Sequence, residues 1–321
     1  DGIPLRGLGT GSTRLLIAGL QRKAAEQTSI VLVDEIEHGL EPHRIVRLLS
    51  SLGAKEQEAP LQVFATTHAP AVLRELSGEQ LVVLREKEDH HNALLIRSED
   101  DIQGTIRSQP EAFLAPSVLV CEGASEVGFV RGLDQDRVSK GEPSIAACGV
   151  ALVDACGVSR IYSRALPLQK AGYRVATLRD DDAKPDAAKE AEFGGLGVIF
   201  MWREGNAIED EIFACASEKA VGELLDYAIT LHGKEMVTSH VASVPDSAIS
   251  LHDIQVSGPM HGYSAWHRKV LAKASSTKKN PWFKTVTAME NIGRQIIGPE
   301  FRSFEQVFQD RVTEIFRWAV N

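Results

Sequence analysis

Four acidic side chains stand where two short apolar segments end. Glu122 follows the apolar run 118–120, and Glu126 comes four residues later, beyond Gly123. Asp180 and Asp182 follow a second apolar segment, 174–179. Because alternate residues of an extended strand point the same way, Asp180 and Asp182 can face one space. Such acids repel one another unless a divalent cation lies among them, so this spacing predicts a site for Mg²⁺ or Mn²⁺.

The segments that must position these acids alternate between strand-like and helix-like patterns. We expect strands at 117–121, 148–154, 174–179 and 197–201, and helices near 124–133, 158–171, 184–192 and 207–217. This alternation predicts an α/β fold, with a parallel sheet covered by helices on both faces. Ligands bind at the carboxyl edge of such sheets. Asp154 lies at the same edge, where it could serve the site or simply cap a helix.

A further acid follows the fourth predicted strand. Glu209 would occupy the third position of a helix that Asn206 could cap, which resembles a capping box. Capping is therefore one role for Glu209. A role as a ligand for a second metal ion, which the family resemblance given below implies, is an equal alternative. Asp180, Asp181 and Asp182 also have a simpler explanation, because Asp is common in solvated turns.

The first 85 residues contain a second set of motifs. The apolar run 29–33 ends in Asp34 and Glu35, which resembles a Walker B element whose Asp supports Mg²⁺ and whose Glu orients the attacking water. Thr10 and Gly11 open a helix as an ABC signature loop would, and His68 resembles the switch histidine. These are the expected nucleotide-binding residues. The alternative is a structural acid pair and a structural histidine.

One part of a nucleotide site is missing from the sequence. No G-x-x-x-x-G-K-[ST] phosphate loop occurs in it. We expect the phosphate-binding Lys to lie upstream, in a longer protein that binds ATP, and we expect this chain not to hydrolyse ATP alone.

Together, these motifs resemble the OLD (overcoming lysogenisation defect) nucleases, and most of all the class encoded beside a UvrD-like helicase. The resemblance implies a Toprim domain, a Rossmann-like parallel sheet with helices on both faces, preceded by part of an ABC ATPase head and accompanied by a C-terminal helical region. Thr10 stands where ABC signatures usually have Ser, and Glu126 where many relatives have Asp. We expect a partial ATPase head at 1–108, a Toprim domain at 113–216, a helical region at 217–300, and a closing helix at 301–321 that packs on the Toprim core.

A basic segment lies within the helical region. Between Ile254 and Met289 the sequence has no Asp or Glu. Cationic and aromatic side chains in such a window could follow a phosphate backbone, although a solvated helix face is the alternative. The expected DNA-binding residues are Arg268, Lys269, Lys273, Lys278, Lys279 and Trp282. Lys284 resembles the catalytic lysine of OLD proteins.

The resemblance implies a metal-dependent DNA endonuclease that nicks and cleaves DNA by a two-metal mechanism. Glu122, Asp180, Asp182 and Lys284 would be catalytic. Glu122, Glu126, Asp180, Asp182 and Glu209 would hold two Mg²⁺ or Mn²⁺ ions. The implied partners are DNA, a second copy that pairs through the ATPase head of the intact protein, and a UvrD-like helicase. Relatives of this kind act in phage defence or DNA repair.

Two other functions remain open. A regulatory ATPase or scaffold could bind DNA without cutting it, and a topoisomerase-like enzyme would need a nucleophilic tyrosine, for which Tyr263 is the candidate. The net charge of −9 excludes a broadly basic nucleic-acid binder. No apolar run approaches a membrane span. The four cysteines form no C-x-x-C pair, so we expect reduced thiols and a cytoplasmic location.

Overall fold

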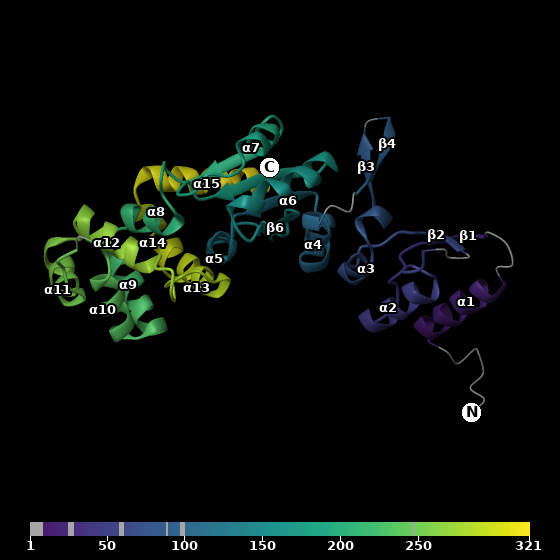
Figure 1. Ribbon diagram of the computed structural model, residues 1–321, viewed down its shortest axis with the longest axis horizontal. Coiled ribbons are helices and arrows are strands. Elements are labelled where there is room, and N and C mark those ends of the chain that lie inside the picture. The colour runs from purple at the N-terminus through teal and green to yellow at the C-terminus, as the bar shows by residue number, and fades with distance from the viewer. Residues whose placement is uncertain (1–8, 25–28, 58–60, 88, 97–99, 246) are drawn as a thin grey trace, which may run out of the picture. The chain divides into compact units, whose positions relative to one another are not determined.

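The computed structural model describes residues 9–24, 29–57, 61–87, 89–96, 100–245 and 247–321. The chain divides into two compact units, Asp1–Leu114 and Ala115–Asn321. Their elements are labelled in Figure 1, and each unit is described by itself. No described helix has both the length and the apolar character needed to cross a membrane.

The first unit is built on two parallel strands. β1 (Ser29–Val33) pairs in register with β2 (Leu61–Ala65), so that Val33 lies opposite Ala65. α1 (Thr10–Ala24), α2 (Pro42–Ser51) and α3 (Pro70–Glu75) accompany these strands. α2 buries Ile45, Leu48 and Leu49, which fall on one face of the helix. The acids that follow β1 therefore lie at the carboxyl edge of this strand pair.

A hairpin and two short helical segments complete the first unit. β3 (Val82–Lys87) pairs antiparallel with β4 (His90–Leu95). The 3₁₀ turn η2 (Gly78–Gln80) precedes the hairpin. α4 (Asp100–Ser108) and η3 (Pro110–Phe113) follow it.

The second unit contains the expected parallel sheet. β5 (Ser117–Cys121), β6 (Val150–Asp154), β7 (Arg174–Arg179) and β8 (Val198–Met201) lie in the order β6-β5-β7-β8. All neighbouring strands are parallel. β5 and β7 have a buried residue at nearly every position, because a parallel sheet covered on both faces leaves no strand side to solvent. The α/β fold class predicted from the sequence is confirmed.

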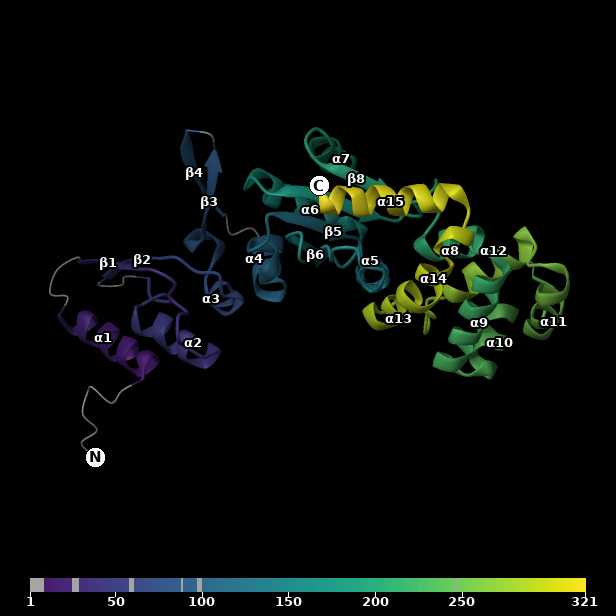
Figure 2. The same ribbon diagram turned by 180° about the vertical axis from the view of Figure 1, so that it is seen from behind.

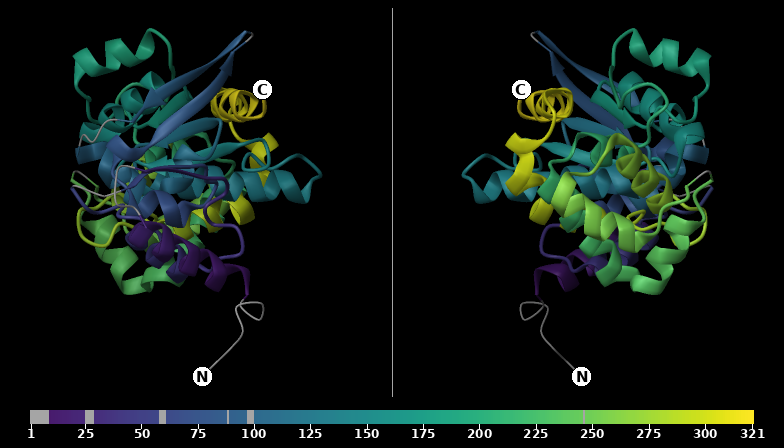
Figure 3. Two further views of the ribbon diagram at one scale, coloured as in Figure 1. Left: turned by 90° about the vertical axis from the view of Figure 1, so that its right-hand side faces the viewer. Right: turned by 90° about the vertical axis from the view of Figure 1, so that its left-hand side faces the viewer.

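Helices cover both faces of this sheet. On one face, Phe129 of α5 (Ala124–Ser139) packs against Phe308 of α15 (Gln306–Val320), with ring centroids 6.0 Å apart. On the other face, Tyr162 of α6 (Val158–Lys170) packs against Phe193 of α7 (Ala187–Gly194), at 5.4 Å. Figures 2 and 3 show α15, in yellow, beside the strands of the sheet.

The remaining helices share the core of the sheet domain. They are α8 (Ile208–Cys215), α9 (Glu218–His232), α10 (Lys234–Ala242), α11 (Leu251–His261), α12 (Ala265–Ser275), α13 (Val286–Ile292), η4 (Gly293–Ile297), α14 (Gly298–Glu300) and η5 (Phe301–Ser303). One hydrophobic cluster runs from Leu119 of β5 through these helices to Ala319 of α15. α5 and α13 lie very close together, since a Cβ on Gly132 would lie 2.2 Å from the carbonyl oxygen of Glu290. The segment 217–300 is therefore packed as part of the second unit.

Candidate functional site

The carboxyl ends of β5 and β7 place Glu122 beside Asp180. The N–H of Glu122 donates to the carbonyl oxygen of Leu178, at 2.8 Å, which continues the ladder between these strands. The N–H of Asp180 in turn donates to Oε2 of Glu122, at 3.0 Å. These two acids, 58 positions apart in the sequence, are neighbours because they follow adjacent strands.

Glu126 enters the same region from the first turn of α5. Its Oε2 accepts a hydrogen bond from the N–H of Gly123, at 2.8 Å, so its carboxylate lies at the start of the helix. Negative charge is favourable there because unpaired N–H groups and the helix dipole face it. Only 3% of the side chain is exposed.

The three consecutive aspartates have different surroundings: Asp180 and Asp181 are buried and hydrogen-bonded, and Asp182 is exposed. Oδ1 of Asp180 accepts from the N–H of Ile208, at 2.9 Å, which joins β7 to the start of α8. The Asp181 carboxylate accepts from Lys184, Arg179 and the N–H of Gly205, and the Asp181 N–H donates to the carbonyl oxygen of Asn206. The hydrogen bond from Lys184 is the largest of the causes that lower the pKa of Asp181 to about 2. Asp182 is exposed.

Glu209 differs from its neighbours on α8. Its side chain is 1% exposed, and neither carboxylate oxygen has a hydrogen-bond partner. The N-cap of α8 is Ala207, whose N–H donates to Asp210, at 3.2 Å. The sequence had suggested Asn206 as the N-cap, but its side-chain amide donates to Glu211 instead. Asp210 takes the capping role that was one alternative for Glu209.

Glu211 is a structural acid that sequence patterns did not single out. Its carboxylate accepts from Nε of Arg203, at 2.9 Å to each oxygen, and from the amide of Asn206, at 2.6 Å. Glu211 holds the loop between β8 and α8 in place. The same loop contacts Asp181 twice, because the N–H of Gly205 donates to its carboxylate and the carbonyl oxygen of Asn206 accepts from its N–H. No local signal distinguishes Glu209 from Glu211, because the difference depends on these long-range partners.

The acids raise one another's pKa values. Burial, followed by the charges of Glu126 and Glu122, raises the pKa of Asp180 to about 10. Burial raises the pKa of Glu126 to about 8, and the charges of Glu209 and Glu122 contribute. Burial likewise raises the pKa values of Glu122 and Glu209, with Asp182 adding its charge to both. Folding has thus gathered carboxyl groups whose ionised forms repel one another.

Together with Arg179, whose charge also acts on Glu122, Lys284 opposes this repulsion. Its charge acts to lower the pKa of both Glu122 and Glu209, which places its ammonium group close to the acids. Its side chain is exposed. We call Glu122, Glu126, Asp180, Asp182 and Glu209 the acid cluster, and Lys284 lies beside it.

The segment before Lys284 is anchored by buried aromatic rings. Trp282 is 1% exposed, and its indole N–H donates to Nδ1 of His240 in α10, at 3.0 Å. The carbonyl oxygen of Trp282 lies 2.9 Å from Nε2 of His232 in α9. Phe283 is 2% exposed and stacks near Tyr227, with ring centroids 6.3 Å apart. Two helices therefore hold the backbone that presents Lys284.

Three residues predicted to contact DNA have other partners in the structure. Trp282 is buried, so its ring is not presented to a base. Arg268 binds Glu218 and the carbonyl oxygens of Phe213 and Ala216, so it joins helices. Lys273 pairs with Asp210, at 3.2 Å. A cationic or aromatic residue in an acid-free window looks the same whether it faces solvent or a neighbouring helix. The DNA contact predicted for Trp282 is therefore wrong, whereas those of Arg268 and Lys273 stay predictions. Lys269, Lys278 and Lys279 are exposed.

No His, Cys, Asp or Glu side chains in the described part of the chain already form a ligand group of three or more around one point. Glu122, Glu126 and Asp180 instead point oxygens at backbone N–H groups. Their chemistry nevertheless suits a hard divalent cation, because all five members are carboxylates. The two buried oxygens of Glu209 have no hydrogen-bond partner. A bound cation would supply the partner that buried polar atoms normally have.

Two of the predicted nucleotide residues of the first unit, Asp34 and Glu35, are joined through Thr66. Its hydroxyl donates to Oδ1 of Asp34, at 2.6 Å, and accepts from the N–H of Glu35, at 2.8 Å. Arg14 of α1 donates to the carbonyl oxygen of Glu35, at 2.9 Å, so the helix that begins at Thr10 and Gly11 contacts the end of β1. The side chain of Thr10 lies outside the described part of the chain.

His68 follows the carboxyl end of β2, and its side chain is exposed. Its backbone N–H donates to Oε1 of Glu37, at 2.7 Å, and Thr67 donates to the other oxygen. Partial burial acts to raise the pKa of Glu37, but these hydrogen bonds outweigh it and lower the pKa. Thr66 and Glu37 are organising residues that the motifs alone did not indicate.

Comparisons with known proteins found one family match, in the first unit, and a distant structural similarity that covers 60% of the chain. Residues 1–74 match the family described as "AAA domain, putative AbiEii toxin, Type IV TA system", which indicates an ATPase-like segment in the first unit. No curated protein matches the chain. Among solved structures, the chain is similar to the C-terminal region of the Xanthomonas campestris pv. campestris OLD protein, with 16% sequence identity and a TM-score of 0.31. That similarity covers 60% of this chain and 98% of the other, and at these values it carries no argument about mechanism.

Proposed function

We propose that the second unit is a metal-dependent DNA endonuclease of the OLD type, and that the ATPase-like first unit regulates it. The observation that carries the proposal is the acid cluster. Five carboxyl groups from the ends of β5 and β7 and the starts of α5 and α8 share one region, two of them with pKa values raised to about 8 and about 10. Such an arrangement costs folding free energy, which a bound divalent cation would recover.

Glu122, Glu126, Asp180 and Asp182 would hold one or two Mg²⁺ or Mn²⁺ ions, and Glu209 would complete the second site. Bound there, the ions would supply an activated water and neutralise the departing oxygen of a phosphodiester. Other residues of the chain fix the positions of these acids. Asp181 and Glu211 hold the strand end and the loop before α8, so that Asp180 and Glu209 keep their relative positions.

Lys284 would add positive charge where charge accumulates in the transition state. A preorganised cation contributes because its position requires no rearrangement during the reaction. The hydrogen bond of Trp282 to His240 and the burial of Phe283 hold the backbone beside Lys284 in place. Lys269, Lys278 and Lys279 would contact the DNA backbone near this point.

The intact protein would bind ATP through Asp34, Glu35 and the helix that begins at Thr10 and Gly11, and would pair with a second copy through this head. A UvrD-like helicase would be its partner, in phage defence or DNA repair. A topoisomerase-like reaction fits less well, because Tyr263 is 6% exposed and packs against Gly258. A nucleophile of that kind must reach a phosphate.

The test is cleavage of supercoiled plasmid with Mg²⁺, Mn²⁺ or Ca²⁺. We expect the parent protein to nick and linearise DNA with Mg²⁺ or Mn²⁺, and expect Asp180→Ala and Lys284→Ala to lose at least 100-fold in rate, the lower end of what removing one transition-state contact costs. A local structural role fits Asp154 better than a role in the site, because its carboxylate accepts from the N–H of Cys156, two residues on. Asp154→Asn is therefore the matched control. A parent that binds DNA but never cuts it would support the scaffold alternative, and equal rates for all variants would exclude this acid cluster.

A further inference from the structure

β8 is an edge strand that nothing in its sequence blocks. It pairs with β7 on one side only, because the sheet order ends there. Natural edge strands usually carry a charge, a proline or a bulge that prevents pairing with another chain. The four residues of β8, Val198 to Met201, include neither a charged residue nor a proline. Val198 is 40% exposed, and Leu196 just before the strand is 89% exposed.

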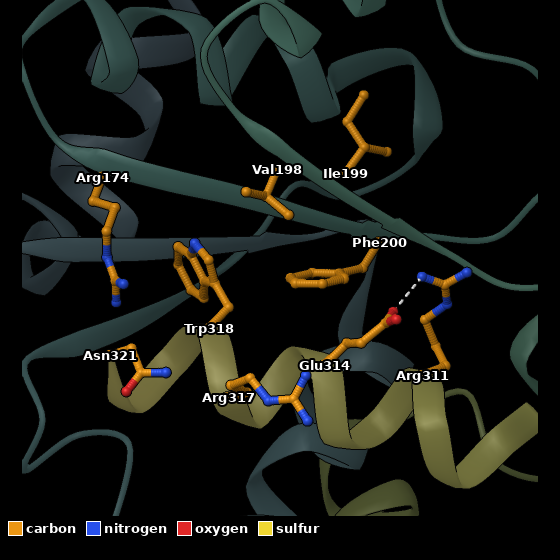
Figure 4. A pocket seen from close by; sticks show the side chains of 9 residues that line it. All are labelled: Arg174, Val198, Ile199, Phe200, Arg311, Glu314, Arg317, Trp318 and Asn321. Carbon is orange, nitrogen blue, oxygen red and sulfur yellow. Dashed lines mark hydrogen bonds and ion pairs between the residues drawn. The ribbon is translucent and has the colours of Figure 1, made fainter. Parts of the chain in front are cut away.

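An open groove runs along this edge, at the opposite end of the sheet from the acid cluster. Its volume is about 520 Å³, and it is lined by β8, the start of β7 and the last turns of α15. Three successive strand residues, Val198, Ile199 and Phe200, line it. Figure 4 shows Val198 and Phe200 on the α15 side of the strand and Ile199 on the other side. Because successive side chains point to opposite faces, a groove that touches all three also passes the backbone edge between them.

The groove has an excess of positive charge. Arg174, Arg311 and Arg317 line it together with a single acid, Glu314. Glu314 pairs with Arg311, at 2.8 Å. In the described part of the chain, no carboxylate forms an ion pair with Arg174 or Arg317. Two guanidinium groups therefore remain for a ligand.

Arg174 is held in a fixed position. Its Nε donates to the hydroxyl of Ser117, at 2.9 Å, and its guanidinium carbon lies 4.5 Å from the centroid of the Trp318 ring. A guanidinium that is stacked on an aromatic ring loses little side-chain entropy when it binds a carboxylate. Phe200 meets the same indole edge to face, at 6.4 Å, and gives the groove an apolar floor.

We propose that this edge binds an extended, acidic peptide segment of a partner protein, which adds to the sheet as a fifth strand beside β8. Strand addition supplies the backbone groups that the open edge lacks. Alternate acidic side chains on the α15 side would meet the arginines beside Val198 and Phe200, and the residues between them would contact Ile199 on the opposite face. A nucleic-acid backbone would also satisfy the arginines, but it cannot extend the ladder of backbone hydrogen bonds. The unblocked edge and the arginines together therefore favour a peptide. This inference is independent of the proposed nuclease activity.

The test uses a fluorescein-labelled peptide of eight residues with alternating Glu and Val, titrated against the whole chain by fluorescence anisotropy. We expect saturable binding, and slower hydrogen exchange of the amides of Val198 to Met201 in the complex. A peptide of the same charge with Pro at its centre should bind at least tenfold more weakly. Arg317→Glu and Val198→Lys, which alter an exposed arginine and block the edge, should each weaken binding at least tenfold.

Arg302→Glu is the matched control, because it makes the same charge change at an exposed position in η5. It should leave peptide binding unchanged. Equal affinity for the proline peptide would overturn strand addition, and equal affinity in Arg317→Glu would overturn the arginine contacts. Binding of a single-stranded oligonucleotide of equal charge in place of the peptide would show a phosphate site and overturn the proposal, as would an absence of binding to every peptide.

Discussion

At the scale of single residues, the site depends on which acids have partners and which lack them. Asp181 and Glu211 are buried acids that accept hydrogen bonds from cationic side chains, whereas Glu209 is equally buried and accepts none. A buried carboxylate that is paired with a cationic side chain keeps that cation satisfied. A buried, ionised carboxylate without a partner destabilises the fold, and Glu209 is of this second kind. The proposed metal site would explain why the chain keeps an acid of the second kind.

Glu209 and Glu211 form a matched pair for this argument. In the presence of EDTA at pH 8, we expect Glu209→Gln to raise the melting temperature by roughly 2–4 °C, since about 1 kcal/mol of charge repulsion is removed. Glu211→Gln should lower it, because Arg203 loses its ionic partner. Differential scanning calorimetry measures both. A fall in melting temperature for both variants would contradict the view that Glu209 is strained without a cation.

Asp181 gives a second prediction. Asp181→Ala removes the acceptor of Lys184, Arg179 and the N–H of Gly205, and it leaves the buried guanidinium of Arg179 with one partner fewer. We expect the free energy of unfolding to fall by about 1–3 kcal/mol, the usual cost of an unsatisfied buried group. Urea titration measures this change.

The exposed neighbour Asp182 is the control for that experiment. Asp182→Ala should change the free energy of unfolding by less than about 0.5 kcal/mol, as is usual for surface positions. Equal losses in the two variants would show that Asp181 is not the brace between β7 and the loop before α8.

At the scale of elements, much of the sheet domain could be predicted from sequence. The apolar runs identified the positions of β5 and β7, and the permissive Gly123 marked the turn into α5. The gathering of Glu122 and Asp180 followed from the general rule that parallel strands end at one edge. What could not be predicted depends on long-range packing, such as the close approach of α5 and α13 at Gly132, or the burial of Trp282 between α9 and α10.

The segment that carries Lys284 should respond to pH through His240. Burial, with a contribution from the charge of His232, lowers the pKa of His240 below its usual 6.5. The neutral ring accepts the indole N–H of Trp282, and a protonated ring cannot. Since the unfolded state binds this proton more tightly, the stability from this bond is present above pH 6.5 and is lost as pH falls below it.

We expect the free energy of unfolding of the parent chain to fall between pH 7.5 and pH 5 by about 1 kcal/mol more than that of His240→Gln, because one hydrogen bond contributes about this much. Urea titrations at both pH values measure this difference. Because Thr277 also contacts His240, Trp282→Phe serves as a second reference, which removes the indole N–H and keeps an aromatic ring. If the chain and Trp282→Phe show the same pH dependence, the indole bond to His240 does not titrate as described.

At the scale of the whole molecule, two units with separate chemistry share one chain. The first 74 residues match an ATPase-like family, and Thr66 organises Asp34 and Glu35 at the end of β1. The second unit has its own sheet, its own core and its own acid cluster. Each unit therefore has acidic residues of its own at the end of a parallel strand, and the acid cluster of the second unit can be tested without nucleotide.

The most direct test of the account is the binding of Mn²⁺ without nucleotide, measured by electron paramagnetic resonance of the free ion. We expect the chain to bind one or two ions per molecule and Asp180→Asn and Glu209→Gln to bind fewer. Asp34→Asn in the first unit and Asp154→Asn in the second should bind as the parent does. If the parent binds no Mn²⁺, or if Asp180→Asn and Glu209→Gln bind as much as the parent, the acid cluster is not a metal site and the proposed nuclease mechanism is wrong.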